Sequence, residues 1–146
     1  MQGKFMNLPY QRNPLMVQFS EQDLKFFARE TRAFAYLALV LSDGTPQVSP
    51  IWFDWDGTHI IFNTARGRVK DKVMHKHPIV SMTITADDPY RYLLIRGKVV
   101  EETEEGGYDM ICSLNEKYHG TYEFPRRPGQ VRVTYKVLPT KLFSET

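Results

Sequence analysis

The sequence contains a single cysteine and no long apolar run, and these two absences exclude several classes of protein. One thiol, Cys112, cannot form a disulfide within the chain, so the sequence excludes a disulfide-stapled scaffold and favours a reducing, cytoplasmic location. No stretch approaches the ~20 apolar residues that a transmembrane helix requires. The N-terminal residues also lack the apolar core of a secretory signal. We therefore expect neither a membrane span nor export.

The chain also has little excess charge and few of the glycines that nucleotide-binding motifs need. With 19 basic and 17 acidic residues, its formal net charge of +2 is too small for a dedicated nucleic-acid-binding protein. Residues 66–68 read Arg-Gly-Arg without the further glycines of a phosphate-binding loop, and no serine occupies a G-x-S-x-G turn. His59, His75 and His77 have no carboxylate or thiol at metal-ligand spacing. We expect no metal site, no conventional nucleotide loop and no serine nucleophile.

Most of the chain has the composition and periodicity of β-strands. The predicted strands are residues 34–41, 47–55, 59–64, 79–86, 92–100 and 130–138. Because most are separated by short turns, we expect them to pair as antiparallel hairpins, and closure into a small barrel would remove the exposed sheet edges. The sequence therefore predicts a mainly β (α+β) barrel of about six strands with two or three short helices. Residues 1–19 are expected to form an N-terminal arm and residues 20–146 a single domain.

Short local motifs indicate where helices begin and strands turn. Ser20 and Asp23 have the spacing of a capping box, which predicts a helix over residues 21–31. Asp56-Gly57 is a strong signal for a tight β-hairpin. Pro50 lies inside a predicted strand and lacks a backbone N–H, so that strand is expected at an edge of the sheet or at a bulge.

The most informative segment is residues 60–78, where a short apolar strand is followed by a basic loop and an amphipathic helix. Arg66, Arg68 and Lys70 crowd the point where this helix should begin. A helix N-terminus carries partial positive charge, so cations there cost stability unless an anion binds at the same place. Two interpretations stay open on these residues alone. The segment is either a pocket for a phosphate or carboxylate group, or a solvated basic face that Lys72 continues.

Polar and aromatic residues gather at the ends of the predicted strands near this loop. They are Gln47, Ser49, Pro50, Trp52, Asn63, Thr64, Ala65, Tyr90 and Tyr92. Aromatic walls, a few convergent polar groups and an anion clamp together suit a flat, phosphorylated ligand. Taken singly, Trp52, Tyr90 and Tyr92 are better explained as barrel core and rim, because Trp and Tyr are largely buried in folded proteins.

Four motifs in a fixed order carry a resemblance to a known family. They are GTPQVSPIWFDWDGTHIIFNTARGRVKDKVMHKHPIVSMTI from residue 44, DPYRYLLIRGKV from residue 88, KYHG from residue 117 and RVTYKVLP from residue 132. Together they resemble the pyridoxamine-5′-phosphate-oxidase-like split β-barrel family, and within it the deazaflavin (coenzyme F-420)-dependent oxidoreductases. The resemblance implies the split antiparallel barrel of FMN-binding proteins. It also implies a homodimer with the cofactor at the subunit interface.

The resemblance further implies roles for individual residues. Arg68 and Lys70 match the basic pair that holds the cofactor phosphate. The segment lining the phosphate and ring is matched by Asn63, Thr64, Ala65 and Arg66, the strand facing the ring by Gln47, Ser49 and Pro50, and the aromatic edge of the pocket by Tyr90 and Tyr92. Many family members carry an asparagine shortly after the basic pair. This chain has Val73 there, so one phosphate or tail contact is expected to be missing.

The activity that the resemblance implies is hydride transfer between reduced coenzyme F-420 and a small organic acceptor such as an activated alkene or a quinone. Arg66 and Lys72 would suit the polyglutamate tail of this cofactor, and Tyr92 is the candidate proton donor. Two alternatives stay open: an FMN-binding oxidase or reductase, and a cofactor-binding barrel without catalytic activity.

Overall fold

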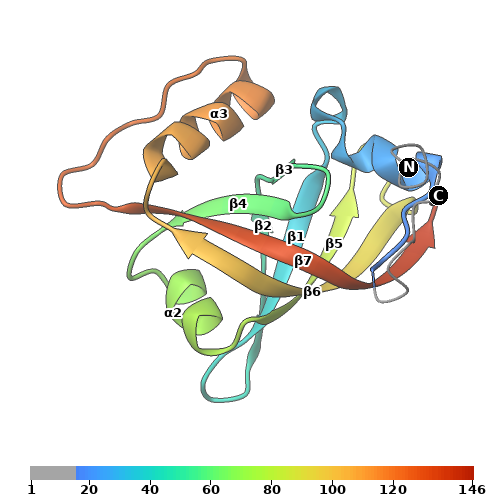
Figure 1. The fold of residues 1–146 in the computed structure, drawn as a ribbon, viewed down its shortest axis with the longest axis horizontal. Coiled ribbons are helices and arrows are strands. Elements are labelled where there is room, and N and C mark those ends of the chain that lie inside the picture. Colours follow the sequence, from blue (N-terminus) through green and yellow to red (C-terminus); the bar gives the residue numbers. More distant parts are fainter. Residues whose placement is uncertain (1–15) are drawn as a thin grey trace, which may run out of the picture.

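The computed structural model describes residues 16–146, which form one antiparallel sheet of seven strands together with three α-helices (Figure 1). The strands are β1 (Phe34–Val40), β2 (Pro46–Ile51), β3 (Asp54–Trp55), β4 (Ile60–Ala65), β5 (Ile79–Thr85), β6 (Tyr92–Thr103) and β7 (Arg132–Glu145). The helices are α1 (Glu21–Leu24), α2 (Val69–Lys76) and α3 (Gly107–His119), and two 3-10 turns, η2 (Lys25–Phe27) and η3 (Arg29–Thr31), follow α1. Of the predicted arm over residues 1–19, residues 1–15 lie outside the described part of the chain.

The predicted fold class is confirmed, with one strand more than expected. The predicted strand over residues 47–55 is interrupted at Trp52 and Phe53, and so forms β2 and the two-residue β3. The interruption has a structural cause, because side chains of α3 bind the backbone of Phe53. The Tyr118 hydroxyl accepts from the Phe53 N–H at 3.2 Å, and the Lys117 ammonium donates to the Phe53 carbonyl at 2.6 Å.

The order of the strands shows how the sheet becomes a barrel. It runs β2-β1-β5-β6-β7-β4-β3, so β2 and β3 are the two edges of the sheet. Only two residues of chain join these edges, and the sheet must therefore curl until they lie near each other. Pro50 lies on β2 as predicted for an edge strand, where its missing N–H interrupts no second ladder.

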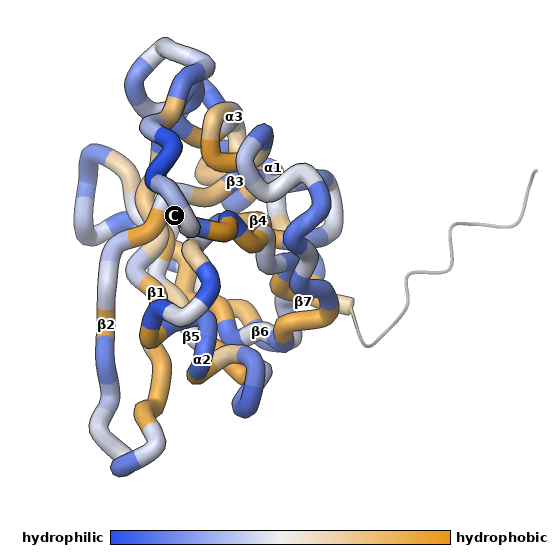
Figure 2. Tube along the Cα trace, turned by 90° about the vertical axis from the view of Figure 1, so that its left-hand side faces the viewer, coloured by the Kyte–Doolittle hydropathy of each residue, from blue (hydrophilic) through white to orange (hydrophobic). Residues whose placement is uncertain are grey.

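Apolar side chains from most strands fill the inside of this curled sheet. Leu37, Phe62, Met82, Ile95 and Tyr135 are all at most 1% exposed, and they come from five different strands. The orange segments of Figure 2 follow the strands, whereas the connecting loops are mostly hydrophilic. No helix within residues 16–146 has both the length and the apolar character needed to cross a bilayer.

The start of the described chain is fastened to its end. The predicted capping box is confirmed, because Ser20 and Asp23 exchange hydrogen bonds between their side chains and backbone N–H groups. The Asp23 carboxylate also accepts from the hydroxyl of Ser144 on β7. The predicted helix over residues 21–31 is shorter than expected, because Ala28 adopts an extended backbone (ψ 133°) and divides the remainder into η2 and η3.

Helix α3 is held against the sheet at both of its ends. Gly107 lies so close to β7 that a Cβ atom there would be 2.3 Å from the Arg132 carbonyl oxygen. At the other end, the Tyr118 hydroxyl donates to the Ala33 carbonyl at 2.6 Å, beside the bond from Lys117 to Phe53. Burial of the Lys117 ammonium lowers its pKa to about 8. The position of α3 over β4 and β7 is therefore well defined.

Candidate functional site

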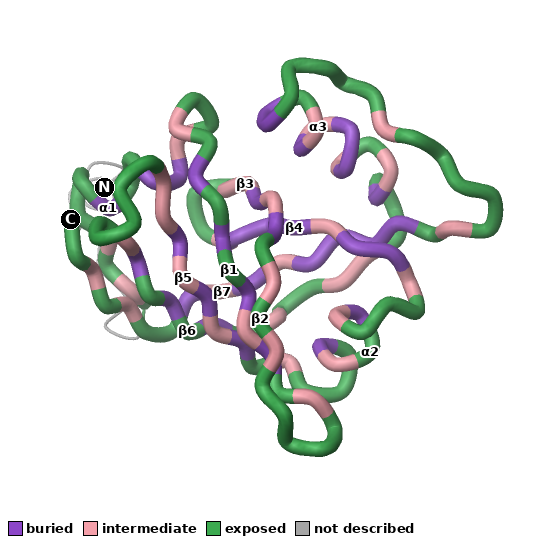
Figure 3. The backbone as a smooth tube through the Cα atoms, turned by 180° about the vertical axis from the view of Figure 1, so that it is seen from behind, coloured by how far each residue is buried: buried purple, intermediate pink, exposed green. Residues whose placement is uncertain are grey.

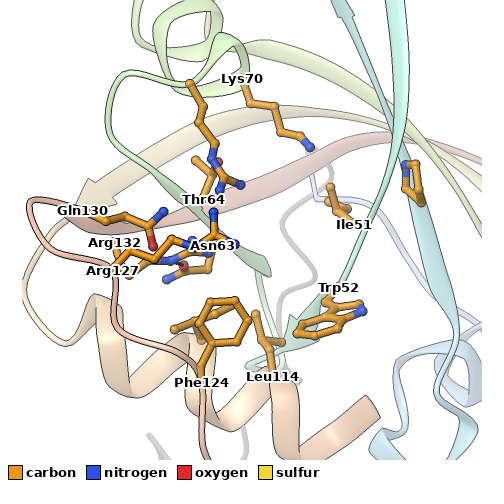
Figure 4. Close-up of a pocket in the computed structure, with 13 residues that line it drawn as sticks. Ile51, Trp52, Asn63, Thr64, Lys70, Leu114, Phe124, Arg127, Gln130 and Arg132 are labelled. Atoms are coloured by element: carbon orange, nitrogen blue, oxygen red, sulfur yellow. Dashed lines mark hydrogen bonds between the residues drawn. The ribbon is translucent and has the colours of Figure 1, made fainter. Parts of the chain in front are cut away.

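A cavity of about 240 Å³ opens between the β2–β3 bend, the end of β4, the start of α2, helix α3 and the loop that follows it (Figure 4). Its walls are Pro50, Ile51, Trp52, Asn63, Thr64, Arg68, Lys70, Ile111, Leu114, Phe124, Arg127, Gln130 and Arg132. Four cations and two amides line this cavity. In Figure 4 the labelled Lys70, Arg127 and Arg132 lie above Trp52, Leu114 and Phe124, which form an apolar wall opposite them. This combination suits a ligand that joins an anionic group to a planar ring.

Arg132, the first residue of β7, is the central cation of the cavity. It is 9% exposed, and no carboxylate in the described part of the chain forms an ion pair with it. Burial, reinforced by the nearby charges of Arg68 and Arg127, lowers its pKa to about 10. A buried guanidinium without a counter-ion is costly for the fold, and a bound anion would offset that cost.

Asn63 fixes the orientation of this guanidinium. Its side-chain oxygen accepts from Arg132 Nε at 2.8 Å, and its amide nitrogen donates to the Gly107 carbonyl at 2.8 Å. A further bond of 3.3 Å reaches the Thr134 hydroxyl. Because Nε is taken by Asn63, the two terminal nitrogens of Arg132 stay available to a ligand.

The loop between β4 and α2 supplies Arg68, and the first turn of α2 supplies Lys70. Gly67 has φ +87°, a left-handed conformation that favours glycine, and Arg68 follows as the N-cap of α2 without a side-chain capping bond. Burial of the Lys70 ammonium, together with the charge of Arg68, lowers its pKa. Two cations therefore meet the positive end of a helix at the wall of the cavity, as the sequence predicted.

Arg66 does not share the position that was predicted for it. It contacts three carboxylates, with Nε 2.9 Å from Glu104 Oε1 and Nη1 2.8 Å from Asp71 Oδ1 and 3.5 Å from Glu102 Oε1. The hydrogen bond to Glu104, aided by Asp71, raises its pKa despite some desolvation. Arg66 is thus engaged by acidic groups and lines no part of the cavity, so the geometry does not support it as a cofactor ligand.

Of the other predicted site residues on β4 and β2, some line the cavity and some do not. Thr64 and Pro50 line the cavity, whereas Ala65 is buried beneath it, opposite Arg132 in the β4–β7 ladder. Gln47 and Ser49 are half-buried on one face of β2 as expected. They lie nearer the start of this strand than Pro50 does, and they do not line the cavity.

Tyr90 and Tyr92 are not brought to this cavity within one chain. Tyr90 is 82% exposed in the turn before β6, and Tyr92 begins β6 opposite Glu145 of β7. The cavity lies toward the opposite end of the β6–β7 pair, where Thr103 pairs with Thr134. Their predicted role as the aromatic edge therefore requires a second copy of the chain and stays a prediction. Val73 packs against the core, which is why this position offers no polar contact to a ligand.

Several residues of the cavity escaped the sequence analysis. They are Ile111, Leu114, Phe124, Arg127, Gln130 and Arg132. All follow the basic segment by 40 or more positions, on α3, the loop after it and the start of β7. The available signal was Arg132 in an alternating strand, which reads as an outward-facing position. Helix α3 and the loop after it cover this position instead, with the centroid of the Phe124 ring 5.2 Å from the Arg132 guanidinium carbon.

Comparison with known proteins agrees with this architecture. The sequence model of the pyridoxamine 5′-phosphate oxidase family matches residues 20–141. The chain belongs to the pyridoxamine 5′-phosphate oxidase family. A search of curated protein sequences gave no match.

Solved structures extend this family assignment. An F-420 reductase superposes with a TM-score of 0.75 and is 32% identical, over 87% of this chain and 100% of its own. A conserved hypothetical protein from Mycobacterium tuberculosis has a TM-score of 0.66 and 23% identity, over 90% of this chain and 87% of its own. A protein provisionally named as a pyridoxamine 5′-phosphate oxidase from Listeria innocua has a TM-score of 0.65 and 19% identity, over 85% and 95%. The resemblance predicted from the four motifs is confirmed, and this family member has an oxidoreductase-like fold.

Proposed function

We propose that this protein is an oxidoreductase that transfers a hydride between reduced coenzyme F-420 and a small organic acceptor such as an activated alkene or a quinone. The observation that supports this proposal most strongly is the nearly buried Arg132 guanidinium. It has no carboxylate partner in the described part of the chain, and it lies near Arg68 in a cavity with an apolar wall. The F-420 reductase that superposes on this chain at 32% identity supports the choice of cofactor.

The residues present fit this cofactor. Arg68, Lys70 and Arg132 would hold its phosphate, and Trp52 and Phe124 would contact its ring. When bound, a deazaflavin supplies a carbon centre that passes hydride. The contribution of the protein is then to orient the ring against an acceptor, to exclude water and to neutralise charge.

A second cavity offers a place for the acidic tail of the cofactor. It measures about 320 Å³ and shares Arg127, Gln130 and Arg132 with the first. Arg126, which also lines it, lies over the ring of Tyr108 at 3.5 Å from guanidinium carbon to centroid. Because Arg66 is ion-paired, we assign the tail to Arg126 and Arg127 in place of the predicted Arg66 and Lys72.

The functional unit in this proposal is a homodimer, because the predicted role of Tyr90 and Tyr92 at the edge of the cavity requires a second copy of the chain. The outer face of the sheet, where exposed residues alternate with buried ones along β1 (Figure 3), carries several large exposed apolar side chains. Its exposed members are Phe34, Tyr36, Val40, Val48, Ile79, Leu94 and Phe143. An apolar face of this extent suits a second copy of the chain.

Substitution of Val48 by aspartate is expected to convert the dimer to a monomer. Val48 is 63% exposed on β2, and an unpaired carboxylate buried there in an interface would cost several kcal/mol. Size-exclusion chromatography with light scattering measures the mass, and Thr58→Asp in the exposed β3–β4 turn is the control. A Val48→Asp protein that remains dimeric would exclude this face as the interface.

Loss of Arg68 and Lys70 together is expected to weaken cofactor binding strongly. The double change Arg68→Ala with Lys70→Ala should cost about 2–5 kcal/mol of binding free energy, because both side chains contact the phosphate in this proposal. Fluorescence titration measures the effect. Lys72→Ala with Lys76→Ala removes the same charge from exposed positions of the same helix and should change the affinity little. Equal effects of the two pairs would reduce the site to a general basic surface.

The proposal is tested directly by titrating the purified protein with oxidised F-420, and in parallel with FMN. Saturable binding of F-420 with reduction of an acceptor supports it. Binding of FMN alone would identify a flavin enzyme of the same family. Binding of F-420 without turnover on any acceptor would identify a cofactor-carrying protein, and failure to bind either cofactor would refute the proposal.

A further inference from the structure

A buried carboxylate lies behind the basic loop and holds three of its neighbours. Asp71, on the first turn of α2, is 6% exposed. Its Oδ2 accepts from the Gly67 N–H at 2.8 Å, and its Oδ1 accepts from Arg66 Nη1 at 2.8 Å and from the Tyr135 hydroxyl at 2.5 Å. Desolvation would raise the pKa of this carboxyl, but the bonds from Tyr135, Gly67 and Arg66 outweigh it and hold the pKa below its usual value.

The partner of Asp71 on the sheet is rigid. Tyr135 is fully buried on β7, and its ring stacks on Phe62 of β4 at 5.7 Å between centroids. Its hydroxyl is thus fixed by the packing of two neighbouring strands. A loop bonded to this hydroxyl takes its position from the core of the protein.

Arg66 links Asp71 to two further carboxylates nearer the surface. It joins Asp71 to Glu102 and Glu104, at and just after the end of β6, and His75 Nδ1 approaches Glu102 Oε1 at 2.8 Å. Asp71, Glu102 and Glu104 therefore hold Arg66 on the side of the loop that faces away from the cavity. Arg68 and Lys70 line the cavity itself.

We infer that Asp71 is a positioning residue of the anion site. By binding the Gly67 N–H and Arg66 while anchored to Tyr135, it sets the turn that presents Arg68 and Lys70 on the same cavity wall as Arg132. This inference rests on the proposed function of the cavity as a phosphate site. It assigns to Arg66 the role of a brace, although the sequence places it among the ligands.

The sign of the effect separates positioning from simple electrostatics. Asp71→Asn removes a negative charge close to the site, so Coulomb attraction alone predicts tighter binding of an anion. The released Arg66 would add to that attraction. Positioning predicts the opposite, because asparagine presents an N–H₂ group to one of the N–H donors that the carboxylate satisfies and so loosens the turn.

The test compares F-420 with the deazaflavin chromophore that lacks phosphate and tail. For Asp71→Asn we expect F-420 to bind at least tenfold more weakly and the phosphate-free ring to change less than twofold. Asp109→Asn is the matched control, since Asp109 holds the same first-turn position on α3, is exposed and carries the same charge. Thermal melting confirms that each variant is folded.

Each outcome discriminates. Unchanged or tighter F-420 binding by Asp71→Asn overturns the inference, as does an equal loss for both ligands, which would indicate general loosening. Should Asp71→Asn fail to fold, Tyr135→Phe keeps the packed ring and removes only the anchoring hydroxyl. It should weaken F-420 several-fold and spare the phosphate-free ring, and no effect would overturn the inference. A wild-type protein that binds neither F-420 nor FMN refutes the proposed function itself, which is a separate result.

Discussion

Replacement of Arg132 by methionine is expected to weaken F-420 binding by about 2–4 kcal/mol and to leave the stability of the free protein almost unchanged. The loss of affinity follows because a nearly buried guanidinium makes strong, charge-assisted bonds to a phosphate. Stability is preserved because methionine fills a similar volume and removes a charge that has no carboxylate partner in the described chain. The substitution leaves only the Asn63 oxygen without its donor.

Fluorescence titration and urea denaturation measure the two quantities on the same preparation. Arg32→Met is the matched control, because Arg32 is exposed in the turn before β1 and lines neither the first nor the second cavity. It should alter neither quantity. A large fall in the stability of Arg132→Met would show that Arg132 is structural. Unchanged affinity would remove it from the site.

The Gly107→Ala substitution is expected to destabilise the protein by about 3 kcal/mol, although alanine is the better helix former. The added Cβ would lie 2.3 Å from the Arg132 carbonyl oxygen and 2.8 Å from its carbonyl carbon. Both are backbone atoms of Arg132, which is paired with Ala65 of β4, so β7 cannot move away alone. Helix α3 must shift, and with it the Gly107 carbonyl that receives Asn63.

Chemical denaturation gives the stability change, and cofactor titration should show a parallel loss because α3 carries one wall of the cavity. Glu116→Ala, at an exposed position of the same helix, should be close to neutral. If Gly107→Ala were as stable as the wild type, the close approach of α3 to β7 would not be a feature of the protein in solution.

The features that were predicted from the sequence depend on neighbouring residues. The strands followed from apolar runs and alternation, the hairpin from Asp56-Gly57 and the capping box from Ser20 and Asp23. The basic pair Arg68 and Lys70 also belongs to this class, because the turn and helix that present it lie within a few residues. The division of the predicted strand over residues 47–55 could not be predicted from neighbouring residues. Its cause is a lysine and a tyrosine more than 60 positions away on α3.

The part of the site that escaped prediction depends on distant residues. Arg66 and Arg68 look alike in sequence, and their roles differ because Arg66 binds the nearby Asp71 and the distant Glu102 and Glu104. From the sequence, Arg132 is predicted to face solvent, but α3 and the loop after it cover it in the folded chain. Tyr90 and Tyr92 were grouped with the site by family resemblance, which does not say which copy of the chain supplies a residue.

The bonds of Asn63 also bear on how the chain folds. It reaches 44 positions along the sequence to Gly107 and 69 to Arg132, so each contact closes a long loop at an entropic cost. Such non-local contacts form slowly, and the arginine is in place only after the last strand has inserted between β4 and β6. A partly folded chain therefore has no complete anion site. Under the proposed function, the free energy of cofactor binding would stabilise only the chain in which β7 is paired with both of its neighbours.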